Sequence, residues 1–289
     1  GLRIGTPSPL IDRAVPFSRA LLDLGFDGKL HVCELFRWRD VWSRDLGSGL
    51  APGAMVDGAF DAARTTIEYD LARHARANPH GYRVTQDTSQ GGSAEGVAWL
   101  VRAAWQYYLL TGDREFLTRV ATTMRPWVDA WIERDADQDG LLVDVTEWMD
   151  HSRFFLFPDG ARVLYSNALF AELLGRFARI ERELGDAPAA VRLEQVQSRF
   201  VRAINARLWN ESAGRYDNLR LWGIADERSS SEGNMLAVLG GVAPPERIGR
   251  IFDAIRTTNW RAAGSTTITP PMTHVDAHND HNFKVWPWW

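Results

Sequence analysis

A carboxyl group near the middle of the chain lies among residues suited to acid catalysis. Asp150 ends the run Glu147-Trp148-Met149-Asp150, and Phe154 and Phe155 follow it closely. Aromatic neighbours desolvate a carboxyl group, and desolvation raises its pKa. A carboxyl group that stays protonated near neutral pH can act as a general acid. We therefore predict that Asp150 donates a proton, and the structural alternative is that it pairs with Arg153 or caps a turn.

The acidic stretch that precedes Asp150 has the spacing of a metal-binding loop. Asp135, Asp137 and Asp139 alternate with other residues and are followed by Gly140, which matches the first half of a calcium loop. The twelfth position should carry a bidentate carboxylate, but it is Thr146. A structural calcium ion at these Asp residues therefore competes with a solvated Asp-Gly turn. We expect no other cofactor.

A second candidate site is the run Trp42-Ser43-Arg44-Asp45. It places a cation and a carboxylate beside an indole ring. Sugar hydroxyl groups both donate and accept hydrogen bonds, so they need partners of both kinds. We predict that Trp42, Arg44 and Asp45 bind a sugar, and a purely structural Arg–Asp pair is the alternative. The chain has 13 Trp, which fits either sugar stacking or an aromatic core.

Histidines near the end of the sequence do not form a recognisable metal motif. His274, His278 and His281 lie close to Asp276 and Asp280. Their spacing matches neither a His-Glu-x-x-His helix nor a zinc finger. Polar loop residues are therefore the expected interpretation.

Composition excludes several classes of function. The chain has 289 residues, 45% hydrophobic content and a formal net charge of −4. Such a charge does not favour a nucleic-acid partner, and no apolar run is long enough to span a membrane. Cys33 is the only cysteine, so internal disulfides and cysteine zinc sites are excluded. We expect a cytoplasmic protein, with secreted and periplasmic locations left open.

Apolar residues at helical spacing recur along most of the chain and predict an all-α fold. Pro16 favours a helix start at or near that residue. Segment 36–45 looks like the lining of a polar site, and segment 265–289 looks like a loop. The predicted helices lie near residues 10–24, 60–71, 93–108, 116–131, 169–184, 193–208, 231–239 and 245–256.

Paired helices with polar loops at alternate junctions predict a toroid of helical hairpins that forms one domain over residues 1–289. An α-solenoid would also consist of paired helices, but the sequence shows no repeat of fixed period.

Short motifs, in this order along the chain, resemble those of the glycogen-debranching (amylo-α-1,6-glucosidase) and glucoamylase type of glycoside hydrolases. They are Trp42-Ser43-Arg44-Asp45-Leu46-Gly47, Thr111-Gly112-Asp113-x-x-Phe116-Leu117, Asp139-Gly140-Leu141-Leu142 with Glu147-Trp148-Met149-Asp150, Val163 to Phe170, and His281-Asn282-x-x-Val285-Trp286-Pro287-Trp288.

The resemblance implies an (α/α)6 toroid that hydrolyses α-linked, gluco-configured sugars with inversion, acting at chain ends as an exo-acting glycosidase. It implies that Asp150 protonates the leaving oxygen. The substrate-binding residues that follow from it are Trp42, Arg44, Asp45, Glu147, Trp148, His281 and Trp286.

An inverting enzyme also needs a base, which in these relatives is a Glu that follows the Val-Trp-Pro-Trp segment. We expect a toroid that is incomplete at the C-terminus, with the base outside this sequence; the alternative is another carboxylate, Glu232 or Asp280. Glu147 and Phe283-Lys284 depart from the resembled motifs, which leaves the sugar open. A rhamnoside, a trehalose-like disaccharide, a phosphorolytic reaction or a non-catalytic carbohydrate-binding module are the alternatives.

Overall fold

Helices make up most of the chain in the computed structural model, which describes residues 5–33, 40–77, 94–135, 137–143, 161–262 and 264–271. Every helix predicted from the sequence is present, so the all-α prediction is confirmed. In chain order the helices are α1 (Pro9–Leu24), α2 (Ser43–Asp45), the π-helical turn η1 (Leu46–Leu50), α3 (Ala51–Val56), α4 (Phe60–Ala77), α5 (Ala94–Thr111), α6 (Arg114–Ile132), α7 (Leu164–Leu184), α8 (Ala187–Arg207), α9 (Ser231–Leu239) and α10 (Pro245–Thr258).

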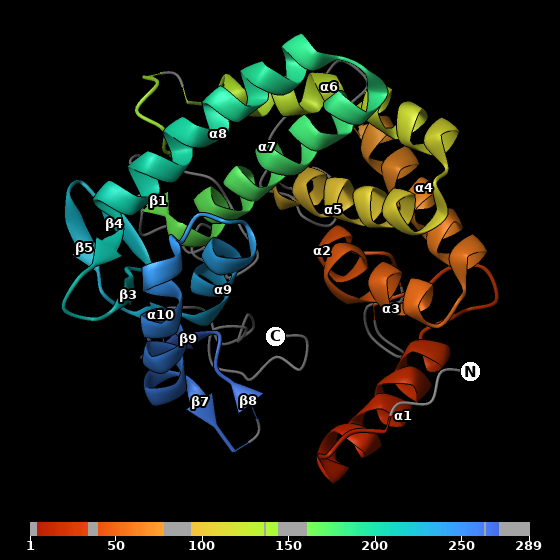
Figure 1. Ribbon diagram of the computed structural model, residues 1–289, viewed down its shortest axis with the longest axis horizontal. Helices are drawn as coiled ribbons and strands as arrows, with labels where there is room; N and C mark the ends of the chain where they lie inside the picture. Colours follow the sequence, from red (N-terminus) through yellow and green to blue (C-terminus); the bar gives the residue numbers. More distant parts are fainter. Residues whose placement is uncertain are drawn as a thin grey trace.

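The helices lie in two concentric layers around a common centre (Figure 1). The inner layer contains α2, α5, α7 and α9, and the outer layer contains α4, α6, α8 and α10. This arrangement is the predicted toroid of helical hairpins. The described helices follow an arc that is open between α1 and the strands beside α10 (Figure 1).

Each layer follows from the distribution of apolar residues. On α6 the side chains of Phe116, Val120, Met124, Trp127 and Trp131 form one buried stripe, as their spacing predicts. Full burial of an apolar side chain of this size contributes about 1.5–3 kcal/mol. By contrast, α7 is buried on almost every side in its first half, as expected for a helix of the inner layer.

Tight junctions join consecutive helices into hairpins. Gly112 between α5 and α6 has a φ of +70°, and Asp113 then caps α6 by accepting a hydrogen bond from the Phe116 amide at 2.9 Å. Gly185 ends α7 with a φ of +96°, and Asp186 caps α8 in the same way. Glycine ends a helix readily in the left-handed region, and aspartate satisfies the free amides of the next.

Short antiparallel strands are the part of the fold that could not be predicted from the sequence. They are two or three residues long, too short for an alternating pattern to appear. A three-stranded sheet has the order β1 (Ala161–Val163), β4 (Leu219–Leu221) and β5 (Ile224–Asp226), and Ala161 lies opposite Leu221. The two-stranded sheets pair β2 (Trp209–Asn210) with β3 (Arg215–Tyr216), β6 (Ser229–Ser230) with β9 (Ile268–Thr269), and β7 (Trp260–Arg261) with β8 (Gly264–Ser265).

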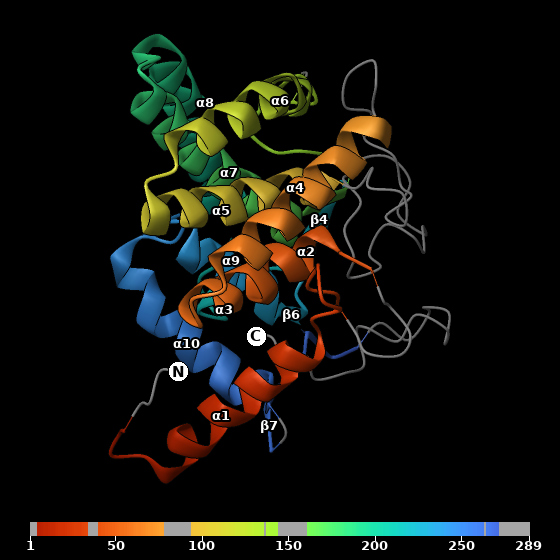
Figure 2. The ribbon, with the colours of Figure 1, turned by 90° about the vertical axis from the view of Figure 1, so that its right-hand side faces the viewer.

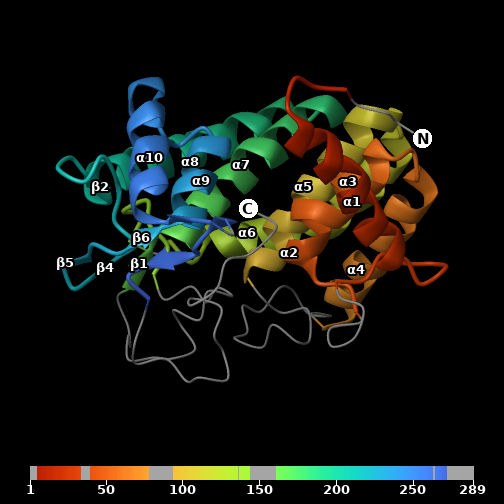
Figure 3. The same ribbon diagram turned by 90° about the horizontal axis from the view of Figure 1, so that it is seen from below.

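The strands mark one face of the ring. β1 leads directly into α7, and β6 leads directly into α9. α2, β4 and β6 lie toward the same face (Figures 2 and 3). The strands therefore anchor the N-terminal ends of two inner helices at this face.

The first part of the chain departs from the sequence analysis at one helix start, and it contains two elements for which no prediction was made. α1 begins at Pro9 and keeps Pro16 inside it, although Pro16 favours a helix start there. η1 and α3 were not predicted either, because Gly47, Gly49 and Pro52 are typical of a loop. Gly47 is needed for packing instead, since a Cβ atom there would lie 2.4 Å from the carbonyl oxygen of Trp99 on α5.

α1 is the least buried long helix of the described chain. Its apolar side chains Phe17, Leu21 and Leu24 are 66%, 46% and 57% exposed. The helix reaches α3 through Leu22, which lies against Gly53. None of the described helices combines the length and apolar character that a membrane span requires.

Candidate active site

A cluster of polar side chains, all buried except the partly exposed Arg44, lies where the inner helices begin. Its members are the second residues of four helices: Arg44 of α2, Glu95 of α5, Tyr165 of α7 and Glu232 of α9. Arg44 Nη1 lies 3.4 Å from Glu95 Oε1, and Tyr165 Oη donates a hydrogen bond to Glu95 Oε2 at 2.7 Å. Glu232 is fully buried within electrostatic range of Arg44 and Glu95. Asp45, which follows Arg44, completes the cluster with an ion pair of 3.5 Å.

Close backbone contacts hold these helix starts together. Gly47 brings η1 against the backbone of Trp99, as described above. Gly233 lets the Leu164 side chain of α7 lie against the backbone of α9, because a Cβ atom there would lie 2.9 Å from Leu164 Cδ2. Ser230 caps α9 by accepting the Gly233 amide at 3.1 Å. These contacts position Glu232 beside the first turn of α7, where Tyr165 lies.

Burial and mutual charge set the protonation of the cluster. Burial alone would lower the pKa of Arg44, but Asp45 and Glu95 more than offset this effect, so its pKa lies above its ordinary value and the group stays charged. Burial raises the pKa of Glu95, although Arg44 and the hydrogen bond from Tyr165 oppose that rise. Burial also raises the pKa of Glu232 well above its ordinary value, with Arg44 opposing and Glu95 adding to the rise.

The inner helices contribute to the electrostatics of the cluster through their backbones. Glu95 and Glu232 lie in the first turns of α5 and α9. The N-terminal end of a helix carries a partial positive charge, which stabilises a nearby acidic side chain by about 0.3–1 kcal/mol. The direction of these helices therefore offsets part of the cost of burying acids.

A second buried network fixes the start of α2 on α4. The Ser43 hydroxyl donates to Asp70 Oδ2 at 2.6 Å and lies 2.8 Å from His74 Nε2. Arg73 pairs with Asp70 Oδ1 at 2.5 Å, so Asp70 is held as an acceptor. Gly96, next to Glu95, leaves room for this network, because a Cβ atom there would lie 2.5 Å from the ring of His74. Ser43, Asp70 and His74 are all buried, so the network holds α2 rather than offering a nucleophile.

The acidic turn at 135–140 is neutralised by arginines. The carboxylate oxygens of Asp135, Asp137 and Asp139 come within 4.8 Å of one another, as a metal site would require. However, guanidinium groups already lie against them, and the amides of Gly140 and Leu141 take the remaining oxygens of Asp135 and Asp139. The ion pairs are Asp135 with Arg199 at 2.7 Å, Asp137 with Arg162 at 3.7 Å, and Asp139 with Arg162 at 2.9 Å and with Arg207.

The calcium ion stays a prediction: the carboxylates have the proximity that a cation needs, and a divalent cation there would compete with arginines that already balance their charge. The turn also serves as a scaffold. The Leu142 amide donates to Asn167 Oδ1 at 2.7 Å, which ties the residues after the turn to the first part of α7.

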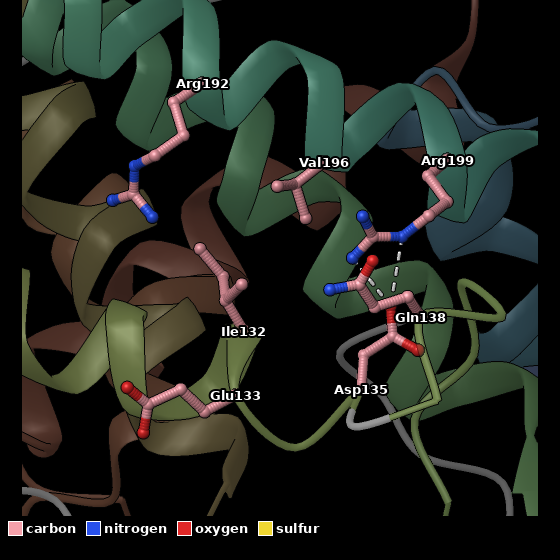
Figure 4. A pocket seen from close by; sticks show the side chains of 7 residues that line it. All are labelled: Ile132, Glu133, Asp135, Gln138, Arg192, Val196 and Arg199. Atoms are coloured by element: carbon pink, nitrogen blue, oxygen red, sulfur yellow. Dashed lines mark hydrogen bonds and ion pairs between the residues drawn. The ribbon is translucent and has the colours of Figure 1, made fainter.

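A surface cavity of about 410 Å³ adjoins the same turn, between the end of α6 and α8 (Figure 4). Arg199 reaches across one side of it to Asp135, and Arg192 and Glu133 lie on the other side (Figure 4). Because α6 and α8 belong to the outer layer, this cavity is separate from the charged cluster. Its lining residues are Ile132, Glu133, Asp135, Gln138, Arg192, Val196 and Arg199.

The structure brings together some of the predicted site residues and leaves others untested. Arg44 and Asp45 lie in the cluster, and Trp42 precedes them at the start of α2. Sequence reasoning did not assign Glu95 or Tyr165 to a site, and it considered Glu232 only as a substitute base. The available signal was their shared place at the second residue of a helix. The remaining predicted residues, Glu147, Trp148, Asp150, His281 and Trp286, lie outside the described residues.

Residues 61–284 match the family model for the bacterial α-L-rhamnosidase six-hairpin glycosidase domain. The chain belongs to this family. The match confirms the toroid glycosidase superfamily that the motifs indicated, whereas the debranching and glucoamylase type is not the family that matches. The search of curated proteins found no match.

Solved structures share the fold of this six-hairpin glycosidase domain. A GH78 rhamnosidase of Bacillus sp. GL1 has a TM-score of 0.68 and 18% identity, and the match covers 88% of this chain and 26% of that one. A rhamnosidase from Klebsiella oxytoca with rhamnose bound has a TM-score of 0.67 and 16% identity, covering 89% and 49%. A GH63 mannosylglycerate hydrolase from Thermus thermophilus has a TM-score of 0.65 and 11% identity, covering 87% and 79%. The chain thus spans about a quarter and about half of the two rhamnosidase chains.

Proposed function

We propose that this chain is the catalytic domain of a glycoside hydrolase that removes a terminal, α-linked sugar with inversion of configuration. The observation that carries the proposal is the buried cluster of Arg44, Asp45, Glu95, Tyr165 and Glu232. A charged guanidinium, a phenol and three carboxyl groups supply both donors and acceptors in a small volume, which is what a polyhydroxylated ligand needs. Membership of a six-hairpin glycosidase family supports the same interpretation.

Asp150 is the proposed general acid. The segment that contains it is anchored at both ends close to the cluster: Leu142 is hydrogen-bonded to Asn167 of α7, and β1 runs into Tyr165 one residue after α7 begins. This double anchor supports a role for Asp150 at this cluster rather than elsewhere. Protonation of the glycosidic oxygen by Asp150 would assist departure of the leaving group while water attacks the sugar from the opposite face.

The proposed reaction also requires a carboxylate base that activates the water. The base must be ionised and in contact with solvent, and in inverting enzymes it lies about 6.5–9.5 Å from the acid. Glu95 and Glu232 do not suit this role because burial raises the pKa of both groups. The other substitute base, Asp280, lies outside the described residues.

For the sugar, we propose an α-L-rhamnoside ahead of the gluco-configured substrate suggested by the motifs. The family model and two of the similar structures are rhamnosidases. The gluco-configured alternative remains part of the test, since the motifs around Arg44 and Asp150 resemble those of enzymes that cleave α-glucosidic bonds.

A panel of glycosides tests the proposal. The wild-type protein and the Asp150→Asn variant would be incubated with aryl α-L-rhamnoside, α-D-glucoside and α-D-mannoside, and with disaccharides of the same sugars. We expect Asp150→Asn to hydrolyse the preferred disaccharide about 10²–10⁴-fold more slowly, because general acid catalysis contributes that much. Hydrolysis of the aryl glycoside by Asp150→Asn should slow less, since the aryl leaving group departs without a proton. NMR identifies the anomer that is released first, and a configuration opposite to that of the substrate shows inversion.

Two results would contradict the proposal. Undiminished disaccharide hydrolysis by Asp150→Asn would remove Asp150 from the mechanism. Calorimetric sugar binding by the wild-type protein without any product after prolonged incubation would instead identify a non-catalytic carbohydrate-binding module.

A further inference from the structure

Glu232 is buried without the partners that a buried acid normally has. Its side chain is fully enclosed, and neither carboxyl oxygen has a hydrogen-bond partner among the described residues. Glutamate is almost never fully buried unless it is paired, because loss of hydration is unfavourable for either protonation state. An acid left in this condition is best explained by a partner that comes with a ligand.

The surroundings of Glu232 show why the protein itself does not satisfy the carboxyl group. Arg44, the nearby cation, is already paired with Asp45 and Glu95. The Tyr165 hydroxyl donates its hydrogen to Glu95. The cap formed by Ser230 fixes the first turn of α9, so Glu232 is held near these groups, while the hydrogen bonds that they make go to Asp45 and Glu95 and not to Glu232.

We propose that Glu232 is a specificity-determining residue, whose carboxyl group binds one hydroxyl group of the sugar unit that is cleaved off. This inference rests on the proposed glycosidase function. A protonated carboxyl group has one donor and an acceptor, and a hydroxyl group offers the same pair in return. The ligand class is therefore a neutral pyranose with a hydroxyl group directed at the first turn of α9.

The alternative role of Glu232 as the catalytic base is disfavoured by its burial. A base must be ionised to take a proton from the attacking water, whereas burial raises the pKa of Glu232 well above its ordinary value. Among the described residues, the charged and titratable groups near it are Arg44 on α2, Glu95 on α5 and Tyr165 on α7. Of these only Arg44 favours the ionised form of Glu232, and burial outweighs its influence on the pKa.

Two variants of Glu232 and one matched control test the proposal. Glu232→Gln keeps the shape and a donor–acceptor pair without the acid, and Glu232→Leu removes hydrogen bonding while filling the space. The control is Glu181→Leu on α7, because Glu181 is equally buried but has both oxygens bound to Arg125 at 2.7 and 2.8 Å. Kinetics on the preferred glycoside, Tm and affinity for the free monosaccharide would be measured for all three.

We expect the two leucine variants to differ in opposite ways in Tm and in kinetics. Glu232→Leu should keep or raise Tm, because it removes an unpaired buried acid, while kcat/KM and monosaccharide affinity fall about 10–100-fold. Glu181→Leu should lower Tm and leave the kinetics of the folded protein unchanged. Glu232→Gln should retain most sugar affinity and turnover.

Substrates that lack single hydroxyl groups identify the contact. The wild-type protein should lose about 10–100-fold in kcat/KM on one monodeoxy glycoside, and Glu232→Leu should show no further loss on that substrate, since residue and hydroxyl group are coupled. On each of the remaining deoxy substrates, the wild-type protein and Glu232→Leu should lose kcat/KM by the same factor relative to the fully hydroxylated glycoside.

Each contrary result overturns the inference in a recognisable way. Wild-type kinetics in Glu232→Leu would exclude contact with the sugar. A fall in Tm equal to that of Glu181→Leu would assign Glu232 to stability, and an inactive Glu232→Gln rescued by azide would identify a base. If the wild-type protein neither hydrolyses nor binds any glycoside, the proposed function fails and this inference fails with it.

Discussion

Replacement of Gly47 by alanine tests whether the contact between η1 and α5 sets the geometry of the charged cluster. A Cβ atom at Gly47 would lie 2.4 Å from the carbonyl oxygen of Trp99 and 2.9 Å from its carbonyl carbon and Cα atom. An ordinary contact needs about 3.4 Å or more, and the obstacle is backbone of an inner helix. The two segments must therefore separate by about 1 Å.

The size of the effect follows from this displacement. Overpacking of a well-packed interior costs about 1–3 kcal/mol, which corresponds to a fall of several degrees in Tm. Arg44 lies three residues before Gly47 and is 3.4 Å from Glu95 on α5, so separation of the segments weakens this ion pair. A displacement of about 1 Å in a catalytic site can reduce the rate by about 10²-fold.

Thermal unfolding and kcat/KM on the preferred glycoside would be measured for Gly47→Ala. Gly249→Ala is the matched control, since Gly249 lies within α10 and a Cβ atom added there would meet no other atom within 4 Å. Alanine in a helix interior stabilises by about 1 kcal/mol relative to glycine, so this control should raise Tm and keep activity. A Gly47→Ala variant that behaves like the control would refute the argument from close packing.

Three further predictions concern the surroundings of the cluster. Ser43→Ala should raise KM and lower Tm only slightly, because the hydrogen bond to Asp70 at 2.6 Å positions the start of α2. Equal KM values in the variant and the wild-type protein would contradict this. The raised pKa of Glu232 means that the folded state binds more protons than the unfolded state above the ordinary Glu pKa of about 4.3. Stability should therefore fall as pH rises from that value, and Glu232→Gln should reduce the slope of Tm against pH between about pH 5 and 8; parallel curves would show that Glu232 does not titrate as described. Chelation by EDTA should leave Tm unchanged, because arginines balance Asp135, Asp137 and Asp139, and a stabilising effect of added calcium would show that a cation displaces them.

The layer of amphipathic helices could be predicted from the sequence because its signals are local. The stripe of α6 and the Gly112-Asp113 junction depend on residues a few positions apart, and both are found as expected. η1 could not be predicted, since its glycines signal a loop until Trp99 of a distant helix is brought against them.

The site was predictable only in part for a related reason. Arg44 and Asp45 belong to one contiguous motif, which a local pattern can reveal. Glu95, Tyr165 and Glu232 come from three helices far apart in the sequence, and only the packing of the inner layer brings them together. The calcium ion stays a prediction, and the arginines that neutralise the acidic turn could not be foreseen, because they come from β1 and α8, which its spacing does not reveal.

The cluster draws one residue from the same place in each inner helix, and this has a consequence for how such a domain can change. In the proposed site, a side chain in the first turn of α5, α7 or α9 contacts the sugar, while the rest of each helix holds the layers together through buried apolar residues and pairs such as Arg125–Glu181. Substitution at these few positions alters one wall of the site without repacking the core. Selection can therefore exchange one sugar for another through single first-turn replacements, and a designer could vary the same positions in a small combinatorial library.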